Sequence, residues 1–183
     1  MAGWRTVGAT MMAVGLLSIL CGVLAFFPAG SYHPWFISWD AQIAAPVWTG
    51  ALATITGASV VTANRDQNRK SLWEVVYVFS ILTSVTCLLM FAVATAAVLT
   101  GPLCYYSYLG AVGIGYLSHA VRYPYPYRGG PGLCLDPLGA EWYHLVLHTM
   151  DLLTSTTVFI LSLGIVVILT TRLLHSGNVN VRG

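Results

Sequence analysis

The sequence predicts an all-α membrane protein: a bundle of four transmembrane helices with a long, aromatic outer loop that a disulfide closes. Composition and charge pattern both support this. Of the 183 residues, 57% are hydrophobic and only 8% are charged, whereas about a quarter of residues in soluble proteins are charged. The charges lie almost entirely between long uncharged stretches, each able to supply the roughly 20 apolar residues that a spanning helix needs. These stretches are residues 6–39, 41–64, 75–121 and 152–171.

The four spans are expected to be helical, because backbone inside a bilayer has no water to satisfy its hydrogen bonds. The chain leaves little room for a soluble module, so residues 1–183 are expected to form a single membrane domain. The expected spans are about 7–27, 43–63, 75–100 and 145–171, with residues 101–144 as the outer loop.

Basic residues predict the orientation. By the positive-inside rule both termini lie in the cytosol, and we expect the plasma membrane as the location. The Trp residues fit two interfacial belts, with Trp4 and Trp73 at the cytosolic interface and Trp35, Trp39 and Trp142 at the outer one. The side with the termini carries Arg5, Arg65, Arg69, Lys70, Arg172 and Arg182, and the opposite side carries Arg122 and Arg128.

A five-span arrangement is the rival, because residues 103–121 are also uncharged and the count of basic residues is the same in both arrangements. Against it, Gly101-Pro102 leaves almost no room for a turn between two spans. Five spans would also place Cys104 and Cys134 on opposite sides of the membrane. We therefore expect four spans, with residues 103–121 as a partly helical segment on the outer end of the bundle.

Two cysteines, Cys104 and Cys134, stand at the ends of the outer loop, on the side where disulfides form. A disulfide between them is expected, with two free thiols as the alternative. Between them lies Tyr123-Pro124-Tyr125-Pro126-Tyr127, whose alternating prolines predict an extended, polyproline-like path. These rings would either dock a partner or rest at the membrane interface.

Glycines follow a seven-residue period in the first span and share a face of the second, which is typical of a close helix–helix contact. Packing within the bundle is the expected role, and a seam for self-association is the alternative. The positions are Gly8, Gly15, Gly22, Gly50 and Gly57.

The last span carries a polar stripe, because six positions fall on one side of the helix. Ionisable groups inside a membrane are costly and by default indicate function. His148 and Asp151 could share a proton, and His144 with His148 could bind zinc, although zinc needs three or four ligands. Structural polar packing is the third reading and the one we expect, with no metal bound. The stripe is Glu141, His144, His148, Asp151, Ser155 and Ser162.

Eight short segments spread over nearly the whole chain form a specific combination. They are Ala25-Phe26-Phe27-Pro28, Ser31-Tyr32, Pro34-Trp35-Phe36, Trp48-x-Gly50-Ala51-Leu52, Gly101-Pro102-x-Cys104, the Tyr-Pro run, Cys134-x-Asp136-Pro137 and Tyr143-His144-Leu145. Together they resemble the vertebrate transmembrane protein 212 family, a resemblance that implies little about function.

More distantly, Pro46-Val47-Trp48-Thr49-Gly50 through Gly57-Ala58-Ser59 is similar to the second span of the membrane-spanning four-domain subfamily A. That resemblance implies four spans, cytosolic termini and a receptor-associated subunit that sometimes dimerises, although the outer loop here is much longer.

The expected function is that of a non-enzymatic accessory subunit, since the sequence carries no nucleophile–base motif and no phosphate-binding glycine loop. No cofactor is expected. The expected partners are the lipid bilayer and other membrane proteins or a second copy of this chain as a homodimer; the net charge of +2 argues against nucleic acid. The alternative is a small ion or proton channel or transporter subunit that uses Asp151 and His148.

Overall fold

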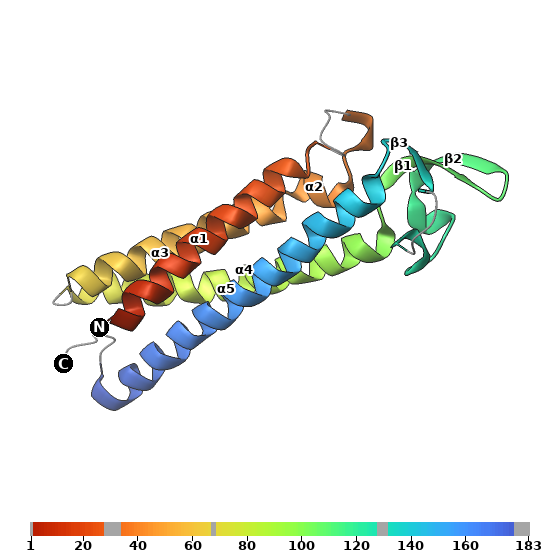
Figure 1. The fold of residues 1–183 in the computed structure, drawn as a ribbon. Coiled ribbons are helices and arrows are strands. Elements are labelled where there is room, and N and C mark those ends of the chain that lie inside the picture. The colour runs from red at the N-terminus through yellow and green to blue at the C-terminus, as the bar shows by residue number, and fades with distance from the viewer. Residues whose placement is uncertain (1, 28–33, 67–68, 128–131, 178–183) are drawn as a thin grey trace.

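The computed structural model describes residues 2–27, 34–66, 69–127 and 132–177. Four long helices run side by side, and a small β-sheet covers one end of the bundle (Figure 1). We call this the capped end, and the opposite end, where α1 begins and α5 ends, the terminal end. The helices are α1 (Ala2–Leu24), α2 (Trp39–Ile43), α3 (Ala45–Arg65), α4 (Lys70–Thr100) and α5 (Ala140–Ser176).

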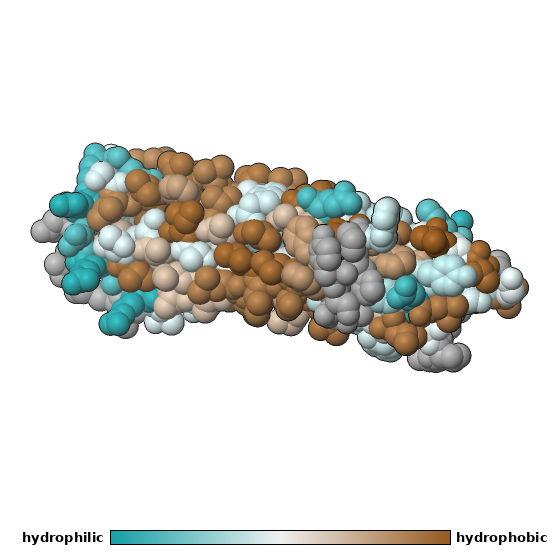
Figure 2. Space-filling view, turned by 90° about the horizontal axis from the view of Figure 1, so that it is seen from above, coloured by the Kyte–Doolittle hydropathy of each residue, from teal (hydrophilic) through white to brown (hydrophobic). Residues whose placement is uncertain are grey.

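Four helical segments are long and apolar enough to cross a membrane, which confirms the predicted four-span bundle. Figure 2 shows apolar residues along the middle of the bundle and hydrophilic residues gathered at the terminal end. That distribution is expected of a bundle whose middle faces lipid. The segments are Gly3–Leu24, Trp39–Arg65, Lys70–Thr100 and Ala140–His175.

The segment 103–121 is mainly a β-hairpin, and its only helical part is a short 3-10 helix, η3 (Leu117–His119), so most of the segment differs from the partly helical one that we expected. Strands β1 (Leu103–Tyr108) and β2 (Ala111–Tyr116) pair antiparallel, and β3 (Cys134–Asp136) joins the other edge of β1. Leu109 and Gly110 both have positive φ, the conformation of a two-residue turn whose twist suits a hairpin. This turn and the aromatic residues of β1 favour a strand pair over a helix.

The Tyr-Pro run also differs from its prediction, because Tyr125–Tyr127 forms a 3-10 turn, η4, instead of an extended path. The amides of Tyr125 and Tyr127 donate to the carbonyls of Arg122 and Pro124. Alternating prolines remove every second donor and leave the tyrosine amides free to close short turns. Two residues of the aromatic loop, Tyr32 and His33, and two of the counted basic residues, Arg128 and Arg182, lie outside the described part of the chain.

A break near the start of the second span separates α2 from α3. Ala44 adopts the left-handed conformation, with φ 53° and ψ 32°, which a residue with a Cβ seldom adopts. Pro46 follows in the first turn of α3, where its missing N–H costs nothing. The break lets α2 turn across the capped end, and this places Asp40 inside the fold.

Glycines form the contact between α1 and α3. A Cβ built on Gly15 would lie 2.7 Å from the Gly50 carbonyl oxygen, and one built on Gly50 would lie 2.5 Å from that of Gly15. Gly8 and Gly57 face each other in the same way. The remaining predicted glycine, Gly22, lies against Val47 of α3. Backbones approach this closely only where side chains are absent.

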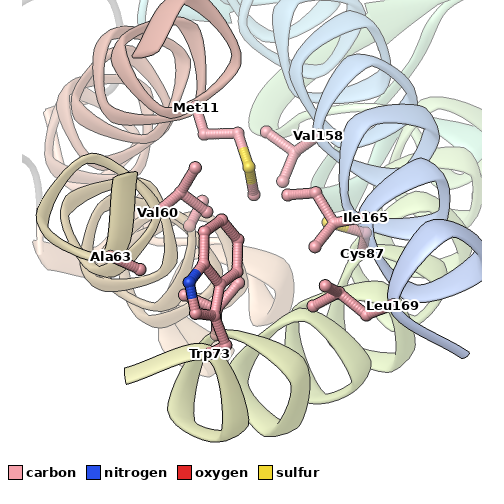
Figure 3. Packing of buried hydrophobic residues seen from close by; sticks show 10 residues of the cluster. Met11, Val60, Ala63, Trp73, Cys87, Val158, Ile165 and Leu169 are labelled. Carbon is pink, nitrogen blue, oxygen red and sulfur yellow. The ribbon is translucent and has the colours of Figure 1, made fainter. Parts of the chain in front are cut away.

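Apolar side chains fill the terminal half of the bundle, where Trp73 points between the four long helices (Figure 3). Trp73 is fully buried and meets Trp4 edge to face at 5.3 Å between ring centroids. The adjacent helices therefore enclose the ring in the first turn of α4, and its depth in the membrane stays a prediction. Trp35 and Trp142, by contrast, are exposed. The cluster around Trp73 is completed by Met11, Ala53, Val60, Ala63, Val76, Cys87, Val158, Ile165 and Leu169.

Candidate functional site: a buried cluster of carboxylates and imidazoles

The polar stripe of α5 faces inward along its whole length. The six side chains come from positions three, four or seven apart, which a helix stacks on one face. All are at most 8% exposed, so the stripe lies against the other helices and the cap. It divides into a cluster at the capped end and single contacts elsewhere.

His148 lies between two carboxylates. Its Nε2 atom is 3.0 Å from Asp40 Oδ2 on α2, and its Nδ1 atom is 3.4 Å from Asp151 Oδ2 one turn further along α5. The second contact has the distance of an ion pair but lacks hydrogen-bond alignment, and Nδ1 has no other partner among the described residues. The structure therefore brings together the predicted pair His148 and Asp151 and adds a second acid.

His144 contacts the other side of the cluster. Its ring meets the His148 ring at 4.3 Å between centroids, and its Nδ1 atom lies 3.3 Å from the Tyr127 hydroxyl. That hydroxyl donates its hydrogen to the Val98 carbonyl at 3.1 Å. Burial, with negative charge nearby, raises the pKa of Tyr127 above its ordinary value, so the hydroxyl keeps its proton.

The hydrogen bonds of Tyr127 determine the tautomer of His144. A hydroxyl has one hydrogen, and a carbonyl oxygen can only accept. Since the hydrogen of Tyr127 goes to Val98, the Tyr127 oxygen must accept from His144 Nδ1–H. The lone pair of neutral His144 is then on Nε2, a buried atom without a hydrogen-bond partner in the described part of the chain.

Asp40 was missed by sequence reasoning. The signal was an isolated acid directly before the second span, in a stretch without other charges. Its side chain is 4% exposed, and its Oδ1 atom has no hydrogen-bond partner among the residues described. One donor atom each from Asp40, His144 and His148 lie within 4.8 Å of one another. The third ligand that a metal would need is thus present, on a different helix from the two histidines.

The remaining stripe residues make structural contacts. Glu141 accepts a hydrogen bond from the Cys134 amide at 2.7 Å, which ties α5 to strand β3 of the cap. Ser162 bonds Ser84 of α4 at 2.9 Å. Ser155 donates to the Leu152 carbonyl of its own helix and does not reach Asp151. Of the six stripe residues, only His144, His148 and Asp151 therefore join the cluster.

The cap is closed by the Cys104–Cys134 disulfide, as predicted. Both cysteines are buried with Leu117 and Ala140 in a small apolar cluster beneath the sheet. The bridge links β1 to β3 next to the Glu141 contact, so the disulfide and the start of α5 stabilise the same part of the cap. The other two cysteines, Cys21 and Cys87, are free and buried in the bundle.

A bundle of four apolar helices with a disulfide-closed cap defines a multi-pass integral membrane protein. The chain belongs to the L6 membrane protein family, whose model matches residues 2–177. The match supports the general class of a membrane-spanning family and not the transmembrane protein 212 family in particular. No solved structure matches the chain.

Proposed function

We propose that this protein is a non-enzymatic accessory protein of the membrane that associates laterally with the spanning helix of a partner membrane protein. The observation that carries this proposal is an apolar groove between α1 and α5 near the terminal end, with a volume of about 510 Å³, that is open to the surroundings. It is lined by Gly3, Trp4, Val7, Ile160, Leu161, Gly164, Ile165, Ile168 and Arg172.

The groove lies between the first turns of α1 and the second half of α5, which line its two sides. Gly164 lies in its wall, and a Cβ added there would meet nothing within 4 Å. Gly15 and Gly50 differ from Gly164, because they are already in contact with each other within the bundle. A small residue on an apolar wall lets a second helix approach closely, so a partner helix with small residues of its own fits this groove.

The glycines of α1 that pack against α3 are not available for self-association. The glycine seam of α1 is covered by α3 and offers no surface to a second copy of the chain. The α1–α5 groove, by contrast, is open to a second copy. We propose that the groove binds a helix of a different membrane protein. The experiment below would also detect a second copy of this chain in the groove.

The test places a photo-reactive amino acid at Ile168 in the groove, and at Val167, an exposed neighbour on α5 outside the groove lining, as the matched control. Irradiation in native membranes should give a discrete crosslinked protein from position 168 and a much weaker one from 167. Gly164→Leu should abolish the product by filling the groove. A product of twice the mass would indicate the homodimer, and equal products or lipid adducts alone would refute the proposal.

Packing in the terminal half of the bundle favours this function over a channel. A route for ions along the bundle axis would have to pass Trp73 and Leu169, which are fully buried in close apolar contact (Figure 3). The buried hydroxyls of Thr56 and Thr83, and those of Ser84 and Ser162, bond to each other in pairs and so are not turned toward an open path, where they could replace an ion's water. The non-enzymatic assignment is supported by the narrow pockets beside the buried cluster, which leave room for about one water molecule or ion.

We also infer that the capped end faces the outside of the plasma membrane and that both termini are cytosolic. The disulfide in the cap supports this, because disulfides persist in oxidising compartments. Arg65, Arg69 and Lys70 between α3 and α4 lie at the other end of the bundle, where the positive-inside rule expects them in the cytosol.

A further inference from the structure

We infer that the carboxylate–imidazole cluster at the capped end is a binding site for a divalent transition-metal ion, zinc being the best fit, with Asp40, His144 and His148 as ligands. This inference is independent of the proposed lateral association. Nitrogen and carboxylate oxygen donors in this ratio are typical of zinc sites with three protein ligands and one open position. Each of the three side chains is buried.

The geometry requires little adjustment. A tetrahedral zinc ion with ligands at about 2.0–2.1 Å separates neighbouring ligand atoms by roughly 3.3 Å. The His148 Nε2–Asp40 Oδ2 distance is 3.0 Å, and the most distant donor atoms of the three residues are within 4.8 Å. His144 and His148 are four positions apart on one helix, a spacing that places two imidazoles on the same metal ion. Rotation of the His144 and Asp40 side chains would close the remaining gap.

The surroundings of both imidazoles match those of metal ligands. A metal-bound histidine usually donates its second ring N–H to a carboxylate or another oxygen, which fixes the ring and makes it more basic. His144 has the Tyr127 oxygen within hydrogen-bond distance of its Nδ1 atom, and His148 has Asp151 Oδ2 at 3.4 Å from its Nδ1 atom, close enough for an ion pair although not aligned for a hydrogen bond. In each case Nε2 is the atom left for the metal. For His144 this follows from the hydrogen bond between Tyr127 and Val98.

The charges of the buried carboxylates also support a bound metal ion. Asp40 and Asp151 are both buried, and among the described residues His148 supplies the ion-pair contact to each of them. One imidazolium balances one of the two carboxylates and leaves the other without a counter-charge. A divalent cation bound to neutral His148 balances both. Isolated buried charges are strongly unfavourable, so a metal ion resolves the imbalance.

The experiment measures Zn²⁺ binding to the full chain in lipid nanodiscs, after chelation and removal of the chelator. The key variant is His144→Gln, because it removes one ligand and leaves both contacts of His148 in place. His148→Ala would leave two carboxylates unpaired and could simply fail to fold. His175→Gln, an exposed histidine near the end of α5, is the matched control.

We expect one equivalent of zinc in the wild-type protein and the control, and a loss of at least tenfold in affinity for His144→Gln. Tyr127→Phe should weaken binding by about 10–100-fold, as is typical when an outer-shell partner is removed, whereas Tyr108→Phe in the hairpin should not. Cobalt(II) should give a visible spectrum of low coordination number that Asp40→Asn changes. An unchanged melting temperature of the metal-free variants would confirm that they fold. No stoichiometric zinc in the wild type, or equal affinity of His144→Gln, would overturn the inference.

Discussion

The Nε2 atom of His148 on α5 lies 3.0 Å from Oδ2 of Asp40 on α2, at the end of the bundle that the β-sheet covers. The contact joins the last span to the short helix before α3. Together with His144 and Asp151, the two residues make a cluster of four ionisable side chains near the cap. The contribution of this contact to the free energy of unfolding can be measured in the absence of metal.

His148→Ala, studied in the presence of a chelator, should lower the free energy of unfolding by about 3–5 kcal/mol, because it leaves two buried carboxylates without a partner. Asp151→Asn keeps the shape of the side chain and should cost at most about 1 kcal/mol, because its contact with His148 Nδ1 is at 3.4 Å and is not an aligned hydrogen bond. Reversible unfolding in mixed micelles, followed by circular dichroism, gives both numbers. Equal small costs would mean that the carboxylates are not charged in the folded protein.

The glycine seam predicts a strong dependence on position. Gly50→Ala should destabilise the bundle by about 1–3 kcal/mol, the usual cost of overpacking, because its Cβ would lie 2.5 Å from the Gly15 carbonyl oxygen. Gly164→Ala is the matched control in a helix interior with nothing within 4 Å. It should be neutral or stabilise by up to about 1 kcal/mol through helix propensity. The same unfolding assay compares them, and similar effects at the two positions would contradict the close approach of α1 and α3.

The buried indole of Trp73 predicts a contrast among tryptophans. Trp73→Ala should cost about 3–5 kcal/mol, as large-to-small changes in cores do. Trp35→Ala should cost almost nothing, because Trp35 is 87% exposed. Quenching by a water-soluble quencher should reach Trp35 and not Trp73 in single-tryptophan variants. Ready quenching of Trp73 would contradict the burial of its ring between the helices.

The cap should depend on its disulfide while the bundle does not. Cys104→Ser should loosen the sheet and cost up to about 3–4 kcal/mol on the loop-entropy account, for a loop with a separation of 30 residues. The helical content should stay the same. Mass spectrometry of unreduced protein should find Cys104 linked to Cys134, with Cys21 and Cys87 alkylated only after denaturation. Free alkylation of Cys104 in native protein would contradict the structure.

Orientation can be tested at the tip of the hairpin. A cysteine at Leu109, which is 89% exposed, should react with a membrane-impermeant maleimide added to intact cells. A cysteine at Arg69, between α3 and α4, should react only after permeabilisation. The variants are matched because both residues are exposed and both lie outside the four long helices. The reverse pattern would invert the proposed topology.

Much of the bundle was predictable from the sequence. The positions of the spans follow from the uncharged stretches, because the thickness of the hydrocarbon core fixes how many apolar residues a helix needs. The choice of four spans over five rested on Gly101-Pro102 and on the two cysteines. The partnership of Cys104 with Cys134 followed from their placement on one side of the membrane. The errors fell in the cap, where residues 103–121 form a hairpin. Outside the hydrocarbon core, backbone hydrogen bonds need not stay within one helix, so the constraint that made the spans predictable no longer applies.

The site shows the same division. The sequence by itself determined which residues of α5 share a face, since helical periodicity places His144, His148 and Asp151 on one side. The tertiary structure alone decided that this face meets Asp40, because the break at Ala44 turns α2 across the end of the bundle. Spacing along one helix fixes neighbours on that helix, whereas a contact between helices depends on how each is bent and rotated. Those angles are set by packing and are not written in any local pattern of residues.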